Sequence, residues 1–306
     1  MIQQSVERFV EDNYDLNSRV ALSSSSTGFS AEHWHSMAEL GWLGLPFEEE
    51  DGGFGGNQID VLVVMEQFGR GLVVEPYLAS IVMGGGALKR GGTNALKSEI
   101  LPQVIQGNLQ LAFAYAEEQS RFDLDDVMTS ARKEGENFIL NGQKSMVQNA
   151  ETADKIVVSA RTSGGQVGPQ GITLFLIDSD AEGLSQDNFP TVDGLRASEI
   201  TLENVSVEPD RILGEVDQGF SILKSVANDA MLALSAEAVG AMEVLYKDTV
   251  DYTQQREQFD HPLSEFQVLQ HRMVDMFMEY EQCKSLLYRA TMETIQDPES
   301  AQRSIH

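Results

Sequence analysis

The chain has 306 residues, of which 42% are hydrophobic and 23% are charged, so we expect a globular protein of two or three domains. Its 48 acidic and 21 basic side chains give a formal net charge of −27, which disfavours nucleic acid and anionic membrane surfaces as partners. Because Cys283 is the only cysteine, no intrachain disulfide can form, and we expect a buried, inert thiol in a reducing compartment, the cytoplasm.

Residues 1 to about 110 are predicted to be helical. Ser30 precedes an apolar-periodic run over 31–45 and is the expected N-cap of that helix. A second helix is predicted over 59–72, with four inward-facing residues, Ile59, Leu62, Val63 and Phe68. The first residues carry no secretory signal, and no apolar stretch is long enough to span a membrane. The three glycines at 84–86 are expected to let helices approach or turn, because they lack phosphate-loop spacing.

From Leu111 the pattern changes to that of strands. The runs at 138–140 and 143–147 flank Asn141-Gly142, a dipeptide typical of tight turns, so we predict a hairpin there. Further strands are expected at 155–160 and 172–177, and a third pair near 200–202 and 206–207. This central part is predicted to be a small, mostly antiparallel β domain.

The helical period returns after Gly219. One long helix is predicted to present a face of small and apolar residues, Ile222, Val226, Ala233, Ala236 and Gly240. A second is expected to open at Ser264 and end at Asp297-Pro298, with an apolar stripe of Phe266, Leu269, Met273, Met276, Phe277 and Tyr280. The fold class is therefore α+β multidomain, with a helical domain at 1–110, a β domain at 111–217 and a helical domain at 218–306.

Three segments together resemble the acyl-CoA dehydrogenase family. They are AELGWLGLPFEEEDGGFGG at 38–56, the 111–150 segment with NGQK at 141–144, and YTQQREQFDHPLSEFQVLQHRMVDM at 252–276. The last is similar to the family pattern Arg-x-x-Phe-x-x-Pro-x-x-x-x-Gln. The resemblance covers nearly the whole chain, and within the family it is closest to chains called small subunits of pimeloyl-CoA dehydrogenase.

The resemblance implies a flavoprotein that uses FAD to oxidise an acyl-CoA thioester, in fatty acid or dicarboxylic acid degradation. In the family a carboxylate removes the α proton, the β hydrogen leaves as hydride to the flavin, and hydrogen bonds stabilise the enolate. It also implies an oligomer, with electron-transfer flavoprotein as the acceptor if the chain is active.

The segment that matches the family's flavin strand is altered. Where the family reads Thr-Glu-Pro and then Gly-x-Gly-Ser-Asp, this chain has Ala116 for the threonine, and Arg121 and Phe122 for the glycine and serine. Where the family has Trp-x-Thr, this chain has 146–148. Each lost hydroxyl removes a hydrogen bond with a net value of about 0.5–1.5 kcal/mol. A modified flavin pocket and a strand pair kept for folding alone are both open. The expected cofactor-binding residues in this part of the chain are Phe113, Tyr115, Ala116, Glu117, Arg121, Phe122, Met146, Val147 and Gln148.

Arg121 has two interpretations. Its guanidinium suits a phosphate, but a surface salt bridge to Asp123 or Asp125 is the simpler alternative. Further along the chain, the resemblance implies that Arg256 and Phe259 contact the FAD of a neighbouring subunit, with Gln267 beside them. Ser264 and Gln267 also have the spacing of a helix capping box.

No catalytic residue is identifiable. The resemblance places the base either beyond residue 306 or at Ala230, and neither offers a carboxylate in this chain. Asp229 is adjacent but points about 100° away on a helix, and Glu237 is expected to be structural or solvated. The family's Asp and Arg near the acyl end correspond to Asn228 and Met231.

Three hypotheses follow. The chain is a subunit of a heteromeric acyl-CoA dehydrogenase, a homo-oligomeric flavoprotein whose base lies outside these residues, or a non-catalytic scaffold that uses the fold for assembly. Because the resemblance calls for more helices after His306, we expect an incomplete helical domain whose apolar stripe over 264–290 is partly uncovered and mediates association. The histidines show no metal-ligand spacing, so no metal is expected.

Overall fold

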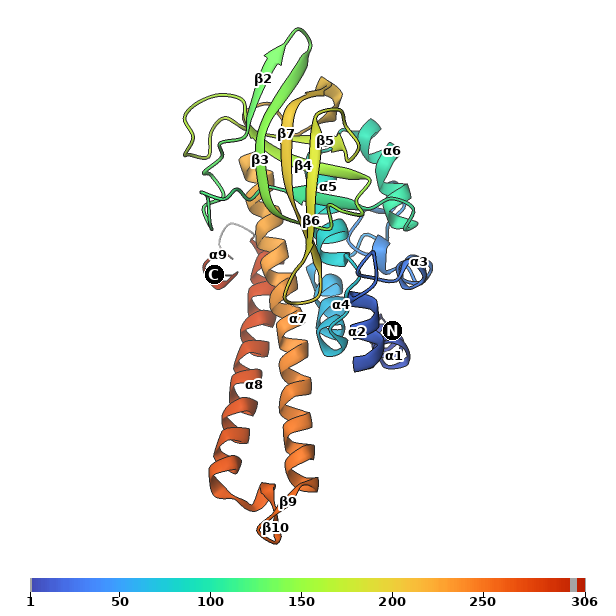
Figure 1. Cartoon of the computed structure of the whole chain (residues 1–306), viewed down its shortest axis with the longest axis vertical. Helices are drawn as coiled ribbons and strands as arrows, with labels where there is room; N and C mark the ends of the chain where they lie inside the picture. The colour runs from blue at the N-terminus through green and yellow to red at the C-terminus, as the bar shows by residue number, and fades with distance from the viewer. Residues whose placement is uncertain (1, 298–301, 306) are drawn as a thin grey trace. The chain divides into compact units, whose positions relative to one another are not determined.

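The computed structural model describes residues 2–297 and 302–305, which form two compact units (Figure 1). The first comprises Met1–Arg19, Asn57–Val73 and Met231–His306, and the second comprises Val20–Gly56 and Val74–Ala230. The combination of helices with a mostly antiparallel sheet confirms the α+β prediction. No helix within the described residues is both long enough and apolar enough to cross a membrane.

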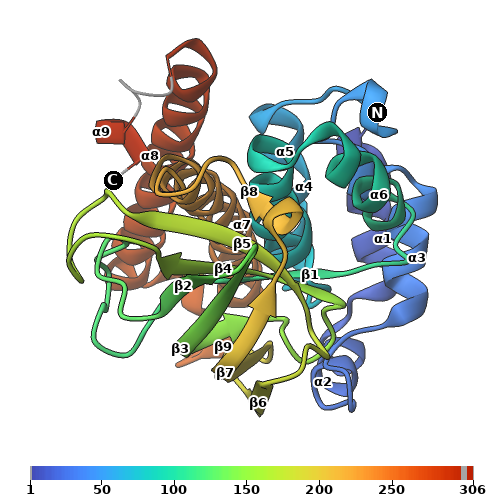
Figure 2. The same ribbon diagram turned by 90° about the horizontal axis from the view of Figure 1, so that it is seen from above.

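The second unit is built around an eight-stranded sheet in the order β6-β7-β3-β2-β4-β5-β8, with β1 paired in parallel to β4 (Figure 2). Its strands are β1 (Leu111–Ala114), β2 (Ser130–Glu134), β3 (Asn137–Gln148), β4 (Lys155–Arg161), β5 (Ile172–Asp178), β6 (Leu184–Pro190), β7 (Arg196–Val207) and β8 (Ile212–Leu213). The predicted strands at 155–160 and 172–177 are therefore confirmed as β4 and β5. One face of the sheet buries an apolar cluster that includes Phe138, Leu140 and Phe175.

The predicted hairpin at Asn141-Gly142 is wrong. Both residues lie inside the single strand β3, and the chain turns instead between β2 and β3 at Gly135, whose φ is 64°. Gly142 marks a bulge in the pairing of β3 with β7, and a Cβ there would lie 2.6 Å from the Cα of Thr129. The dipeptide thus permits close backbone approach within a strand rather than a turn.

The predicted strand pair near 200–202 and 206–207 is also wrong. Both segments belong to β7, whose neighbours are β3 and β6. The polar residues Glu203 and Asn204 between 200–202 and 206–207 suggest a break between two strands in the sequence. The twelve-residue strand β7 spans them because β3 on one side and β6 on the other supply its backbone partners.

The helical elements of this unit are α3 (Ala31–Glu39), the 3₁₀ helices η1 (Trp42–Gly44), η2 (Glu49–Asp51) and η4 (Pro209–Arg211), the π-helix η3 (Leu78–Gly85), α5 (Gly86–Gly91) and α6 (Asn94–Ile105). Ser30 is the N-cap of α3, because its Oγ accepts the His33 N–H at 3.2 Å. The expected helix over 31–45 ends early at Glu39, since Gly41 adopts a left-handed φ of 82°. A Cβ on Gly84 would lie 2.5 Å from that of Leu111, so close approach explains this glycine.

The first unit is helical. It contains α1 (Ile2–Asn13), α4 (Gln58–Gly71), most of α7 (Phe220–Gln255), α8 (Gln267–Gln296) and the short α9 (Gln302–Ile305); α2 (Leu16–Ser23) spans the boundary between the units. Helices α4 and α7 cross at Gly69 and Gly240, where an added Cβ would meet the carbonyl oxygens of Glu237 and Glu66 at 1.8 and 1.9 Å. In α4, Leu62 and Phe68 are buried as predicted, but Ile59 is exposed.

Helices α7 and α8 run antiparallel, joined by β9 (Glu257–Gln258), β10 (His261–Pro262) and the 3₁₀ helix η5 (Leu263–Glu265) (Figure 1). The predicted capping box is wrong, because α8 begins at Gln267 without a side-chain cap and the Ser264 carbonyl accepts from the side chain of Gln270. Helix α8 ends at Gln296 as expected, and Pro298 lies outside the described residues.

Candidate functional site

The end of β1 and the irregular part of β3 meet to form what we call the rim, residues 115–117 and 144–148. The Ser145 N–H donates to the Ala116 carbonyl at 2.9 Å, and Lys144 Nζ donates to the Tyr115 carbonyl at 3.4 Å. A register shift in the pairing of β3 with β7 falls between Lys144 and Val147, and Met146 has a φ of 54°. The structure therefore brings together the two stretches that the sequence singled out.

Beneath the rim lies a buried ion pair. Lys144 Nζ is 2.7 Å from Glu117 Oε1, and it also donates to Ser159 Oγ at 2.9 Å. The Glu117 carboxylate accepts the backbone N–H groups of Met128 and Thr129, at 2.7 and 3.1 Å. One carboxylate thus holds both ends of the segment 117–129, which we call the loop.

The pair is ionised near neutral pH. Burial raises the pKa of Glu117, but the charge and hydrogen bond of Lys144 and a hydrogen bond from Gln119 outweigh it and bring that pKa to about 2. Burial lowers the pKa of Lys144 to about 8, and Glu117 partly offsets this effect. Two buried charges are tolerated here because each is paired and hydrogen-bonded.

The rim offers mostly backbone donors to a cofactor. Its side chains include Ala116, a half-buried Gln148 and an exposed Met146, while Val147 is buried in the sheet. The Glu117 N–H is taken by Ser120 Oγ at 3.1 Å and the Met146 N–H by Glu199 Oε1 at 3.2 Å. Within the described residues, the N–H groups of Tyr115 and Ala116 have no protein acceptor. The backbone N–H groups at 115–116 are therefore donors of the kind that the acceptor atoms of a flavin ring require.

Two aromatic residues pack together where β1 meets the rim. Phe113 is buried in β1, and its ring centroid lies 5.6 Å from that of Tyr115. Tyr115 is half-buried, and burial raises its pKa. Its hydroxyl is therefore neutral across the physiological range and is no proton acceptor there.

The tip of the loop projects Arg121 and Phe122 into solvent. Phe122 is 97% exposed, and Arg121 holds a φ of 50°, in the region that favours glycine. The expected salt bridge to Asp123 or Asp125 is wrong, since no ion pair of Arg121 occurs among the described residues. The guanidinium of Arg121 is therefore available to a ligand or a partner.

Arg161 anchors the base of the same loop, and sequence reasoning missed it. Its guanidinium donates to the Asp125 carbonyl at 2.8 Å and to the Gln166 carbonyl at 2.6 Å, and it also meets the carbonyls of Gly168 and Gln170. The position of Arg161 at the end of the apolar strand β4 is the sequence feature that marks it. Its partners are backbone carbonyl groups, which a pattern of residue types does not reveal.

On α7, the position at which the resemblance expected a carboxylate is occupied by a buried, apolar alanine. Ala230 is 7% exposed. The adjacent Asp229 forms an ion pair with Arg90, which also donates to the Gly86 carbonyl at 3.2 Å. The Asp229 carboxylate is therefore engaged by a cation, which disfavours it as a general base. Arg90 was not singled out in the sequence.

In the other unit, Arg256, Phe259 and Gln267 gather where α7 turns into α8 (Figure 1). The Arg256 carbonyl accepts the Leu263 N–H at 2.8 Å, which closes the turn. Phe259 is 85% exposed with a φ of 59°, and its ring packs edge-on against Phe266 with centroids 6.4 Å apart. All three predicted residues are exposed, so they face solvent or another chain.

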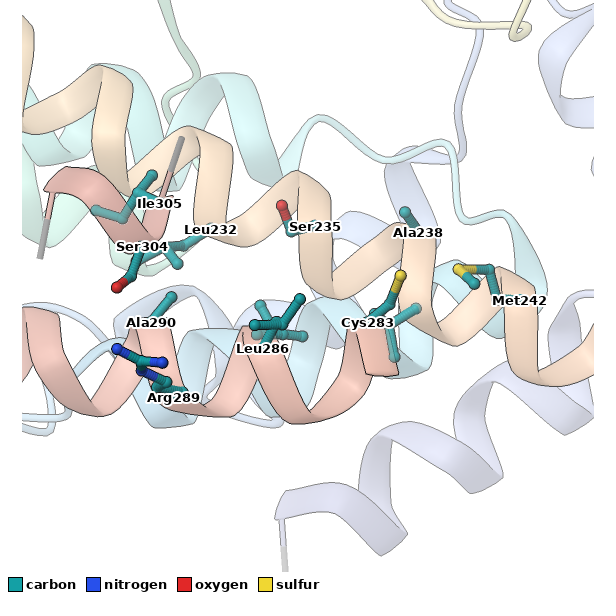
Figure 3. Close-up of a pocket in the computed structure, with 12 residues that line it drawn as sticks. Leu232, Ser235, Ala238, Met242, Cys283, Leu286, Arg289, Ala290, Ser304 and Ile305 are labelled. Carbon is teal, nitrogen blue, oxygen red and sulfur yellow. The ribbon is translucent and has the colours of Figure 1, made fainter. Parts of the chain in front are cut away.

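Between α7 and α8 lies an apolar groove of about 640 Å³, closed at one end by α9 (Figure 3). Cys283 lies in this groove and is half-buried, which corrects the expectation of a buried thiol. The groove is lined by Leu232, Ser235, Ala238, Val239, Met242, Cys283, Leu286, Leu287, Arg289, Ala290, Ser304 and Ile305. The expected apolar stripe over 264–290 is partly uncovered, because Phe277 is 46% exposed and Leu286 61% exposed, whereas Tyr280 is buried. The described residues contain no cluster able to hold a metal ion.

Comparisons with known proteins agree with this architecture. Models of the N-terminal, middle and C-terminal domains of acyl-CoA dehydrogenase match residues 1–108, 112–205 and 217–305. The solved structure "PigA with FAD and proline" superposes with a TM-score of 0.91 and 27% identity, covering 99% of this chain and 80% of that one.

Curated relatives place the chain in the same family. It is 34% identical over 268 residues to "3-(aryl)acrylate reductase" of Clostridium sporogenes, covering 86% of this chain and 71% of that protein. It is 30% identical over 267 residues to "Caffeyl-CoA reductase-Etf complex subunit CarC" of Acetobacterium woodii, covering 86% and 70%. The chain thus belongs to the acyl-CoA dehydrogenase family, whose members are flavin-dependent oxidoreductases acting on CH–CH bonds.

Proposed function

We propose that this chain is an FAD-binding subunit of a hetero-oligomeric acyl-CoA dehydrogenase, acting on the α,β bond of an acyl-CoA thioester. The observation that carries the subunit role is the absence of a usable carboxylate at 228–231 of α7. Asn228 and Met231 are uncharged, Ala230 is buried, and the Asp229 carboxylate forms an ion pair with Arg90. The proton acceptor therefore comes from elsewhere in the assembly or from polypeptide outside these residues.

Residues of two parts of the chain are proposed to hold FAD. The N–H groups of Tyr115 and Ala116 present hydrogen-bond donors at the rim, and Arg121 presents a cation at the loop tip. Arg256, Phe259 and Gln267, exposed at the α7–α8 turn, are proposed to contact the FAD of a neighbouring subunit. Bound FAD supplies the hydride acceptor, while this chain's own residues hold and orient it.

The proposed partners follow from the relatives. A similarity to a protein described as a subunit of a reductase–Etf complex supports electron-transfer flavoprotein as the acceptor. The partly uncovered groove supports association with another dehydrogenase-like subunit. A small-subunit role like that in pimeloyl-CoA dehydrogenase, in fatty acid or dicarboxylic acid degradation in the cytoplasm, is the finer form of this proposal. The domain limits 1–110, 111–217 and 218–306 are proposed with it.

One observation favours the scaffold alternative. Two of the rim's backbone donors, on Glu117 and Met146, are already satisfied inside the protein. In a chain that kept the fold only for assembly, backbone N–H groups at the rim would pair with protein acceptors, because no bound cofactor would need them.

Expression with and without a second acyl-CoA dehydrogenase-like chain as candidate partner separates these functions. We expect visible flavin absorbance from the purified chain, and acyl-CoA-dependent dye reduction when the second chain is present. Dye reduction by the chain alone would contradict the subunit role. A colourless preparation, alone and in the complex, would favour the scaffold.

A further inference from the structure

The peptide bond between Tyr115 and Ala116 carries an N–H group at the rim that has no acceptor within the described residues. Its carbonyl oxygen accepts from Lys144 Nζ at 3.4 Å. The chain contains no cis peptide bond in its described parts. Because the C=O and N–H of a trans peptide point in opposite directions, a carbonyl aimed at the buried ammonium turns the Ala116 N–H away from it.

This peptide is held on both sides. The Ala116 carbonyl, which belongs to the next peptide, accepts the Ser145 N–H at 2.9 Å. Lys144 and Ser145 are neighbours on β3, so the same strand fixes two successive peptides of the 115–117 segment. The direction of the Ala116 N–H is thus set by two contacts from β3.

The ammonium of Lys144 is in turn fixed by its partners. It has three protons, and three acceptors surround it: Glu117 Oε1 at 2.7 Å, Ser159 Oγ at 2.9 Å and the Tyr115 carbonyl. Lys144 has no exposed side-chain surface, so water does not screen its charge. A cation in such a low-dielectric place polarises the peptide to which it donates, and this strengthens the N–H at the other side of that peptide.

We propose that Lys144 is a positioning residue for the flavin: it orients and polarises the 115–116 peptide so that the Ala116 N–H donates to a carbonyl oxygen of the FAD ring system. This rests on the proposed function that the chain binds FAD. Lys144 itself does not touch the cofactor. It acts through one peptide, whereas the other contacts of Lys144 hold the loop and the sheet together.

The test compares the wild type with Glu117→Gln/Lys144→Met, a double variant that removes the ammonium without leaving an unpaired buried carboxylate. Lys155→Met is the matched control, because it removes a cation paired with Asp178 on the same sheet, outside the rim. FAD affinity is measured by absorbance titration, the midpoint potential of bound FAD by spectroelectrochemistry, and the Ala116 amide by NMR of protein labelled with ¹⁵N-alanine.

We expect the double variant to bind FAD about 2- to 10-fold more weakly, the range for one hydrogen bond. Its midpoint potential should be more negative, since a weaker donor stabilises the electron-rich reduced ring less. The Ala116 amide proton should move downfield when FAD is added to the wild type, and less in the double variant. Lys155→Met should match the wild type in all three measurements.

Equal affinity, potential and amide shift in the wild type and the double variant would overturn the positioning role while leaving the proposed function intact. If the double variant does not fold, the NMR spectrum of the wild type tests the inference. An Ala116 amide signal that does not shift when FAD is added overturns it. A wild type that binds no FAD, alone or in its complex, would overturn the proposed function and this inference together.

Discussion

Glu117 and Lys144 belong to the two segments of the rim, and Lys144 Nζ lies 2.7 Å from Glu117 Oε1 with almost no exposed side-chain surface on either residue. The carboxylate closes the loop through the N–H groups of Met128 and Thr129, while the ammonium reaches the backbone of Tyr115. One ion pair therefore couples the loop to the segment after β1 that carries the candidate flavin donors.

Removing one member of this pair should destabilise the fold strongly. Lys144→Met leaves Glu117 as an unpaired buried carboxylate, and we expect a loss of about 3–5 kcal/mol in the free energy of unfolding. Glu117→Gln/Lys144→Met should recover a large part of that loss. Denaturant titration measures both, with Lys155→Met as the control for loss of a partly exposed cation. A single variant as stable as the double one would contradict the prediction.

The same pair predicts a pH dependence in acid. The folded pKa of Glu117 is about 2 and its ordinary value is 4.5, so the unfolded chain takes up this proton at a higher pH than the folded protein. The contribution of Glu117 to stability is therefore full above pH 4.5 and falls as the pH drops toward 2. The free energies of unfolding of the wild type and Glu117→Gln should accordingly converge across that interval, and a constant difference would show that Glu117 does not titrate there.

Asp229 should not behave as the catalytic base. In the assembled active enzyme, Asp229→Asn should leave kcat within about threefold of the wild type, because its carboxylate is paired with Arg90. The substitution should lower stability by about 1 kcal/mol at most, the range for a partly exposed ion pair. Loss of a general base typically lowers the rate by about 10²–10⁴-fold, and a loss of that size here would assign the role to Asp229.

Association should depend on the groove between α7 and α8. Leu286 lines the groove and is 61% exposed, so Leu286→Glu should shift the mass measured by light scattering toward that of a single 33.7 kDa chain. Val274→Glu is the control, because Val274 is similarly exposed on α8 but does not line the groove. A wild type that is monomeric alone and with the candidate partner chain would refute association through this face.

The crossing of α4 and α7 should tolerate no side chain at Gly240. A Cβ there would lie 1.9 Å from the Glu66 carbonyl oxygen, so Gly240→Ala should force the helices apart and lower stability by about 1–3 kcal/mol. Gly165→Ala is the matched control, since no atom lies within 4 Å of its added Cβ. Thermal unfolding of the two variants tests this, and equal melting temperatures would argue against close packing at Gly240.

Local patterns predicted much of the fold. The Ser30 N-cap, the strands β4 and β5 and the α7–α8 pair were all readable, because each depends on residues close together in the chain. The errors at Asn141-Gly142 and at 200–207 share a cause. Both runs contain turn-forming residues, but long-range pairing of β3 with β7 keeps each strand continuous.

The candidate site divides in the same way. The sequence by itself determined the family, the altered residues Ala116, Phe122 and Gln148, and the missing carboxylate at Ala230, since these are matters of residue identity. Only the tertiary structure decided that Lys144 donates to the Tyr115 carbonyl and that Arg90 forms an ion pair with Asp229. It also decided that Arg161 holds the loop by donating to the Asp125 carbonyl. These contacts join residues far apart in the chain through backbone atoms or buried charges, and such pairings depend on how the strands and helices pack.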